Sequence, residues 1–315
     1  MLLSRVADAL YWIARYLERA EHSARLIEVG LDLGLGRAGT RGTADRLYAS
    51  LGMSDASQPA DRGPLVAAAV FDLANRSSVA ACVTAARENG RQVREEISSD
   101  MFEQLNALFL AVRQIHSTAD REARPALLCR TVISGIHLFQ GITDATLGHA
   151  EGWQYLQAGR FIERAGATAA LLDRFVSEGA TQADGRLESV DWVALLQSCS
   201  ALEAYCRHYT ADVRPERVTE FLLLSADFPR SVRFAAARIE SALQALARAS
   251  GRGGAGRTER LIGRLHASLD YGQVDEILND DPHVYLAGIS RQCALIHAAI
   301  YQSYIAYPIE SAIPA

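Results

Sequence analysis

The sequence predicts an all-α protein, a helical bundle made of two related, duplicated halves packed as one unit. Three observations support this fold class. The composition favours helix over sheet, because only 7% of residues are aromatic, eight are proline, and alanine and leucine are frequent. Apolar residues recur at every third or fourth position along most of the chain, which is the period of an amphipathic helix. One charged segment also occurs twice, in the first and second halves of the chain.

Composition and charge limit the class of protein. With 315 residues, of which 49% are hydrophobic, the chain can bury a sizeable core as one large domain or two ordinary ones. A net charge of −5 and a pI near 5.9 argue against nucleic-acid binding, which requires a basic face. No apolar run approaches the roughly 20 residues that span a bilayer, and the N-terminus begins as a charged amphipathic helix rather than a signal peptide.

The five cysteines form no Cys-x-x-Cys pair, and their odd number, without a secretory signal, indicates a reducing compartment. We therefore expect a soluble, cytoplasmic protein with no nucleic-acid or membrane partner. All 32 basic residues are arginine, since the sequence contains no lysine. This excludes a Schiff-base lysine and a P-loop lysine, and it leaves planar guanidinium groups that suit carboxylate or phosphate.

The helices can be placed along the chain from this periodicity. The first is expected from Ser4, as N-cap, to Gly30, as stop signal. Connections rich in Gly, Ser and Pro are expected at 34–42 and 53–63, with a short helix near 44–52 between them, and the GRGGAG run at 251–256 predicts a further loop. The remaining helices are expected at 77–98, 100–116, 125–148, 152–178, 190–209, 215–224, 230–249, 257–270 and 283–306.

An internal repeat predicts the two halves. Residues 15–28 (RYLERAEHSARLIE) and 160–173 (RFIERAGATAALLD) are identical at six of 14 positions and conservative at several more. A second pair, FDLANRSSVAAC from residue 71 and LSADFPRSVRFA from residue 224, follows in the same order at a similar spacing. Duplication explains both matches better than chance, so we expect halves at about 1–145 and 146–315, related by a rough two-fold axis.

The repeated helix carries charges at the same phase in both copies. Arg15, Glu18 and Arg19 in the first copy correspond to Arg160, Glu163 and Arg164 in the second. His22 lies one turn after Glu18 on the same face. A solvated face, a buried ion network between the halves and a ligand site are all compatible with this pattern. We expect Glu18 and Glu163 to lie near each other, each beside an arginine of the repeat.

A second charged segment, residues 85–100, places Arg87, Arg91 and Arg94 on one helix face. A solvated helix with Glu–Arg pairs is one reading, and a bidentate site for an anionic ligand is the other. We expect Arg15, Arg19, Arg87 and Arg91 to contribute to one anion-accepting site, because the glutamates of these motifs neutralise only some of the arginines.

A metal site is not expected. Glu18 and His22 have the spacing of two bundle ligands, but the second copy has Gly166 and Ala167 in place of Glu21 and His22. Neighbouring arginines would also repel a cation. The other histidines are scattered along the chain, and their spacing assembles no Ser–His–Asp or Cys–His set.

Four stretches together resemble the alpha-E domain family of bacteria. They are MLLSRVADALYWIARYLERAEHSARLIEV, AARENGRQVREEISSDMFEQLN, EGWQYLQAGRFIERA and LLLSADFPRSVRF, which extend from the N-terminus to residue 234. The helical remainder is compatible, so the resemblance covers essentially the full chain, as an N-terminal and a C-terminal alpha-E repeat. It implies an all-helical fold with a recurrent glutamate motif, matched here by Glu18 and Glu163.

The resemblance also implies partners. Members of that family are typically encoded beside, or fused to, a circularly permuted ATP-grasp protein, often near a transglutaminase-like peptidase. We therefore expect action with an ATP-grasp amidoligase in the synthesis or modification of peptide or amide bonds. An anionic peptide-like ligand would be held in an Arg/Glu-lined cleft, with no cofactor. The candidate ligand-binding residues are Arg15, Arg19, His22, Arg87, Arg91, Arg160 and Arg164.

Two alternatives stay open. One is a stand-alone enzyme with Glu18 or Glu163 as general base, and the other is a purely structural helical adaptor. Burial separates these readings. Glutamates that are buried and paired only with arginines of the other half favour the structural role, whereas an opening onto a concave cleft favours a ligand site.

Overall fold

The computed structural model describes residues 2–34, 41–53, 62–117, 124–181, 189–251 and 256–306. Helices contain 83% of these residues, and the described part of the chain has no strand. The all-α prediction is therefore confirmed. Residues 34–42 and 53–63, expected as connections, lie partly outside the described residues, as does most of the 251–256 loop.

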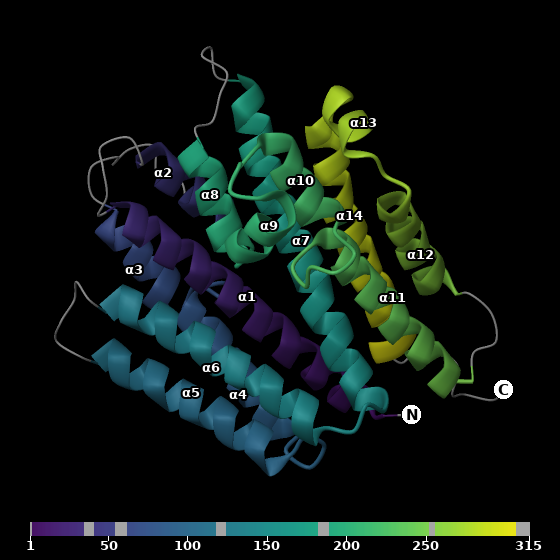
Figure 1. The fold of residues 1–315 in the computed structure, drawn as a ribbon. Coiled ribbons are helices and arrows are strands. Elements are labelled where there is room, and N and C mark those ends of the chain that lie inside the picture. Colours follow the sequence, from purple (N-terminus) through teal and green to yellow (C-terminus); the bar gives the residue numbers. More distant parts are fainter. Residues whose placement is uncertain are drawn as a thin grey trace.

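Two long helices, α1 (Ser4–Gly34) and α7 (Glu151–Thr181), lie side by side at the centre of the molecule (Figure 1). On one side, α1 belongs to a closed ring of four helices in which each packs against the next; the others are α4 (Val79–Gln92), α5 (Ser99–Ser117) and α6 (Arg124–Thr146). On the other side, α7 closes an equivalent ring with α11 (Val232–Ala249), α12 (Arg257–Asp270) and α14 (Pro282–Ile300).

Shorter helices cover the ends of these rings. They are α2 (Arg41–Ser50), α3 (Gly63–Phe71), α8 (Ser189–Ser198), α9 (Leu202–Tyr209), α10 (Pro215–Leu224), α13 (Val274–Asn279) and a π-helical turn, η1 (Tyr301–Ile305). Sequence periodicity missed α3 and α13, which have nine and six residues. Helices this short show too few turns to display a period.

Three helix boundaries differ from expectation by more than three residues. α4 ends at Gln92, where the Val93 amide donates to the Gly90 carbonyl in a tighter turn, instead of at residue 98. α1 continues one turn past Gly30, because this glycine makes room for a ring: a Cβ there would lie 2.7 Å from the Tyr48 side chain. The expected helix 190–209 is divided into α8 and α9 at Ser200, whose φ is 49°. The Ala201 amide donates to the Leu196 carbonyl, which is the six-to-one bond of a left-handed helix terminus.

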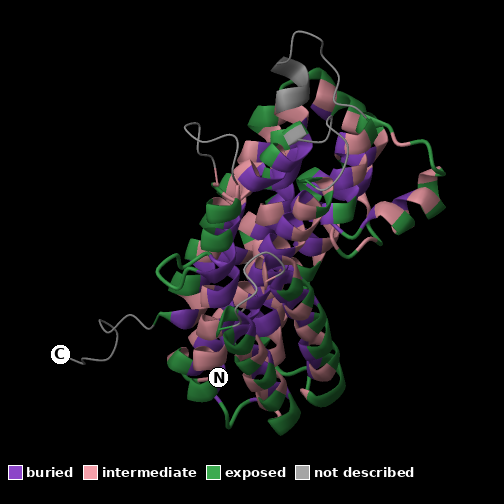
Figure 2. Ribbon diagram, turned by 90° about the vertical axis from the view of Figure 1, so that its left-hand side faces the viewer, coloured by how far each residue is buried: buried purple, intermediate pink, exposed green. Residues whose placement is uncertain are grey.

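The buried residues form one continuous core. Figure 2 shows them along the inner faces of the helices, with exposed residues on the outside. Among the described helices, α6 alone is long and apolar enough to cross a membrane by length and composition. One of its faces packs against α1 and α5, and helices in protein cores meet the same criterion.

Candidate functional site

The two copies of the charged motif meet where α1 crosses α7. Gly159 permits this crossing, because a Cβ at that position would lie 2.3 Å from the Tyr11 carbonyl oxygen and 3.3 Å from the Ala14 Cβ. Backbone therefore packs on backbone at this point. The close approach brings Arg15, Glu18 and Arg19 of α1 within reach of their counterparts on α7.

The glutamates exchange arginines across this crossing. Glu163 accepts hydrogen bonds from Arg15 Nε and Arg19 Nε, each at 2.7 Å. Glu18 accepts from Arg164 Nε at 2.5 Å and from Arg164 Nη2 at 2.7 Å, a bidentate pair. Arg160 Nε lies 3.9 Å from Glu18 and completes the reciprocal set. Each carboxylate is thus neutralised by the opposite helix.

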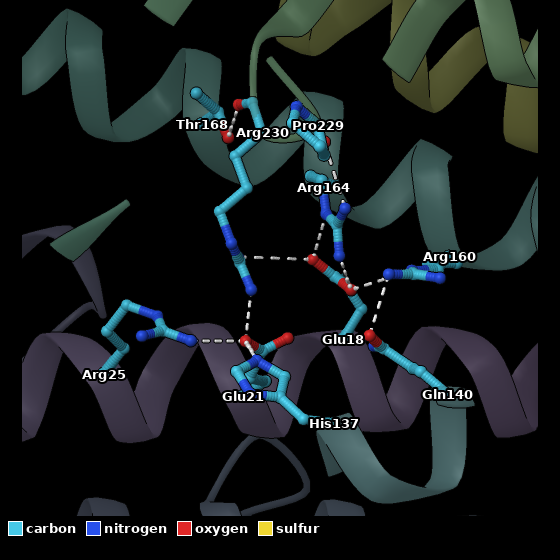
Figure 3. Close-up of polar contacts among 10 residues, drawn as sticks. All are labelled: Glu18, Glu21, Arg25, His137, Gln140, Arg160, Arg164, Thr168, Pro229 and Arg230. Carbon is cyan, nitrogen blue, oxygen red and sulfur yellow. Dashed lines mark hydrogen bonds and ion pairs between the residues drawn. The ribbon is translucent and has the colours of Figure 1, made fainter. Parts of the chain in front are cut away.

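A further carboxylate, Glu21, extends the network (Figure 3). Its side chain is fully buried. Its Oε1 receives hydrogen bonds from Arg25 and from Arg230, and it also lies 2.8 Å from His137 Nε2. Arg230 comes from the loop before α11 and reaches between the two glutamates, with Nη1 3.7 Å from Glu18. The ring of α7, α11, α12 and α14 therefore contacts α1 through this loop as well as through α7.

The same loop is also fixed by α7. Arg164 Nη1 donates to the Pro229 carbonyl at 3.0 Å, and Thr168 Oγ1 donates to the Arg230 carbonyl at 3.3 Å. Arg164 thereby connects Glu18 to the loop that delivers Arg230. The loop, α1 and α7 form one hydrogen-bonded unit, with Arg164 only 3% exposed at its centre.

Sequence reasoning missed the role of Glu21, Arg25 and Arg230, although a signal was present. At the positions equivalent to Glu21 and Arg25, the second copy has Gly166 and Ala170. At the position equivalent to Arg230, the first copy has Ser77. Glu21, Arg25 and Arg230 are therefore absent together from the aligned positions. A joint absence of this kind indicates that the three residues contact one another.

The network carries a surplus of positive charge. Six arginines, at positions 15, 19, 25, 160, 164 and 230, surround three glutamates. Burial, together with the Arg164 charge, lowers the pKa of Arg160 to about 10. Burial and Arg230 lower the pKa of His22 to about 4, so His22 is neutral at physiological pH. Cations that lack counter-ions in a region without water lower the pKa of neighbouring basic groups in this way.

Two glutamates of the network, Glu21 and Glu163, are held ionised. Burial alone would raise the pKa of Glu163, but Arg15 and Arg19 outweigh this effect and lower it below its ordinary value. For Glu21, Arg230, His137 and Arg25 together outweigh burial and hold its pKa well below the usual range. Glu18 is 1% exposed. Buried, ionised carboxylates that already accept strong hydrogen bonds favour a structural ion network over a general base.

Arg87 and Arg91 make their described polar contacts on α4 and α5. Arg87 donates from Nε and Nη2 to Asn106 Oδ1 on α5, at 3.2 Å each, and pairs with Glu88. Arg91 also pairs with Glu88, and its side chain is 64% exposed. Within the described residues, no hydrogen bond or ion pair joins these arginines to Arg15 or Arg19. A single anion site made by all four has no contact to support it.

An arginine-lined pocket of about 310 Å³ lies between α7 and α11, near the end of α6. Arg160 and Arg164 line it from α7, and Arg238 lines it from α11. Arg238 stacks on the Phe234 ring, with its guanidinium carbon 4.8 Å from the centroid. Arg160 donates from Nη2 to Gln140, but its Nε is buried without a hydrogen-bond partner. The surplus charge of the network therefore reaches a solvent-accessible pocket.

Metal ligands do not gather here. Within the described residues, no three His, Cys, Asp or Glu side chains are grouped as an ion would require. Glu18 and Glu21 face guanidinium groups instead, and among the described residues no hydrogen bond or ion pair joins Glu18 to His22.

Comparison with known proteins identifies relatives but no activity. A family model for alpha-E, described as a predicted alpha-helical domain with a conserved ER motif, matches residues 2–305. The dipeptide occurs at the central crossing as Glu18-Arg19 and Glu163-Arg164. Uncharacterised proteins from Mycobacterium bovis and from strain CDC 1551 of Mycobacterium tuberculosis are each 26% identical over 94% of this chain. The chain spans only 35% of the length of these relatives, and no solved structure matches it.

Proposed function

We propose that this chain, which belongs to the alpha-E family, is a binding domain that holds an anionic, peptide-like ligand for an ATP-grasp amidoligase. One observation carries the proposal: surplus guanidinium charge from the α1–α7 network borders the pocket between α7 and α11. Arg160 and Arg238 supply the positive charge in the pocket, because Arg164 is already hydrogen-bonded to Glu18. A carboxylate entering the pocket would supply the missing counter-charge and accept hydrogen bonds from planar donors.

The partnership is supported by the family and by the length of the relatives. Alpha-E proteins resemble this chain along nearly its entire length, and that resemblance implies a circularly permuted ATP-grasp partner and a transglutaminase-like peptidase nearby. In the mycobacterial relatives, about two thirds of the polypeptide lies outside the matching region. A domain that regularly occurs with other modules suits a ligand-presenting role in cytoplasmic peptide or amide-bond synthesis.

The binding role can be tested with one pair of variants on α11. Arg238→Gln removes a pocket charge, whereas Arg248→Gln removes an exposed arginine from the last turn of the same helix. Titration calorimetry with N-acetyl-Ala-Ala, a singly charged anion, should show at least tenfold weaker binding for Arg238→Gln, or about 1.4 kcal/mol. Arg248→Gln should bind like the parent. Equal affinity for all three proteins would refute the pocket as an anion site.

The partner is tested separately. Co-expression with a circularly permuted ATP-grasp protein from the same genome, followed by co-purification and mass spectrometry, should recover a complex. If a complex forms, its amide-forming activity should fall with Arg238→Gln and not with Arg248→Gln. Recovery of the alpha-E chain alone, at cellular concentrations of both proteins, would count against the amidoligase partnership.

A structural adaptor is the second candidate, and the burial of the glutamates favours it. Glu18 pairs with Arg160, Arg164 and Arg230, all from the second half of the chain, and Glu163 pairs with arginines of α1. If the conserved motif only joins the two bundles, changing it would lower the stability of the protein and leave its ligand affinity unchanged. The Arg238 experiment separates the two candidates, because Arg238 lies outside the ion network.

We also propose that the two rings arose by duplication, with a boundary near residue 145. The order of packing supports this, since α1, α4, α5 and α6 form one ring and α7, α11, α12 and α14 the other. The loops before α4 and α11 also match in detail. Ser78 Oγ donates to the carbonyl of Asp72, six residues earlier, and Ser231 Oγ donates to the carbonyl of Ser225, also six earlier. Both hydroxyls cap the helix that follows.

A further inference from the structure

The arginine-lined pocket contains one acidic side chain, Asp144, among the described residues that form its wall. Asp144 lies near the end of α6 and is exposed. It makes no side-chain hydrogen bond or ion pair with any described residue, although Arg160, Arg164 and Arg238 border the same pocket. A carboxylate that lines the same pocket as three arginines and pairs with none of them is available for an external cation.

Asp144 also lines a small cavity that adjoins the pocket. The cavity measures about 30 Å³ and shares Asp144, Gln157 and Arg160 with the larger pocket. Its other walls are the apolar side chains of Ala14, Leu17, Phe139 and Leu156, from α1, α6 and α7, and the polar side chains of Gln140 and Thr143. Asp144 therefore borders both spaces, at the side of the pocket formed by α6, whereas Arg238 borders it from α11. The two unpaired charges of opposite sign come from different elements.

We infer that the pocket accepts a zwitterionic ligand, a free amino acid or short peptide, with its carboxylate at Arg160 and Arg238 and its ammonium group at Asp144. The inference rests on the proposed function and names the class of ligand for the same site. A ligand with a single charge would pair either with Asp144 or with the arginines, but not with both. A ligand with both charges satisfies both and leaves neither Asp144 nor Arg238 without a counter-ion.

The rest of the lining suits the middle of such a ligand. Gln154, Gln157 and Ser241 offer both donors and acceptors, which a peptide amide needs. Trp153, Phe161 and Phe234 provide apolar surface for a side chain. The volume of about 310 Å³ lies at the lower end of the range for small-molecule sites, about 300–1,000 Å³. This size favours a ligand of one or two residues over a long peptide.

Three matched probes test the inference with the intact chain. Ala-Ala carries both charges, N-acetyl-Ala-Ala carries only the carboxylate, and Ala-Ala amide carries only the ammonium group. Calorimetric titration of the unmodified protein should rank Ala-Ala at least tenfold above each of the other two. Trp153 lines the pocket, so tryptophan fluorescence provides a second readout.

Two variants assign the charges to their residues. Asp144→Asn should remove the preference for Ala-Ala over its acetylated form and leave binding of the acetylated form unchanged. Arg238→Gln should remove the preference for Ala-Ala over its amide. Glu103→Gln, at an exposed acidic position on α5, is the matched control and should change neither preference.

The outcomes separate this inference from the proposed function. If the acetylated probe binds as tightly as Ala-Ala and Arg238→Gln weakens both, the anion pocket stands and the zwitterion assignment is wrong. If the amide binds best, the carboxylate assignment fails. If none of the probes binds at millimolar concentration, both the inference and the peptide-binding role fail together, and the structural adaptor is favoured.

Discussion

Glu18→Gln is the sharpest test of the central ion network. The Glu18 carboxylate is 1% exposed and accepts two hydrogen bonds from Arg164, which is itself 3% exposed. Removing one partner of a buried ion pair costs about 3–5 kcal/mol, because a buried charge loses its counter-ion. Glutamine keeps the size and one carbonyl acceptor. We therefore expect a loss of about 3 kcal/mol, at the lower end of that range.

Glu88→Gln provides a matched control. Glu88 also pairs with two arginines, Arg87 and Arg91, but its side chain is 41% exposed. Exposed pairs contribute about 0–1 kcal/mol, so this variant should unfold at nearly the parental denaturant concentration. Urea titrations followed by circular dichroism at 222 nm would measure both, with the slope compared to detect changes in the denatured state.

Two results would refute the reasoning. A Glu18→Gln protein as stable as the Glu88→Gln control would mean that the network does not stabilise the contact between α1 and α7. A variant of full stability that loses activity in the proposed amidoligase complex would instead support Glu18 as a catalytic base. A large stability loss with unchanged affinity for N-acetyl-Ala-Ala agrees with a network that is structural and a pocket that is separate.

Three further predictions concern packing, pH and coupling. Gly159→Ala should destabilise the fold by about 1–3 kcal/mol in urea unfolding, because the new Cβ would meet the α1 backbone. Gly141→Ala, in open space on α6, should stabilise the fold by about 0.5–1 kcal/mol. Equal effects of the two changes would contradict the close crossing of α1 and α7. The pKa of His22 is about 4 in the fold and about 6.5 in the unfolded chain, so the unfolded chain takes up the proton first as the pH falls. The free energy of unfolding should therefore decrease as the pH drops from about 6.5 to about 4. His22→Gln should reduce this dependence in urea titrations at different pH. In a double-mutant cycle, Glu21→Gln and Arg230→Gln should show a coupling free energy of at least about 1 kcal/mol, and additive losses would show that the two do not interact.

Much of the fold could be predicted because helices are local. Periodicity placed α10 and α12 at their observed bounds, and α5, α6 and α11 within about two residues, since each helix shows its own apolar stripe. It failed at Ser200, where one residue in the left-handed region ends α8. A serine in that conformation leaves no trace in a hydrophobic pattern.

The candidate site was predicted only in part. The repeated Arg-x-x-Glu-Arg motif identified the charges that meet at the α1–α7 crossing. It could not show that Arg87 and Arg91 face Asn106 and Glu88 rather than Arg15, because helix phase gives a face but not the helix that packs on it. The role of Arg238 was also missed, since a lone arginine on an amphipathic helix resembles any solvated residue.

The sequence by itself determined the all-helical class, the positions of most helices and the repeated charged motif, because these depend on composition and on residues three or four positions apart. Only the tertiary structure decided which charges are neutralised. Arg230 reaches Glu21 across 209 residues of chain, and Gly159 sets how closely α1 and α7 approach. The energy of an ion pair depends on distance and burial. Both are fixed by how helices pack, so the balance of charge at the pocket could not be read from the order of residues.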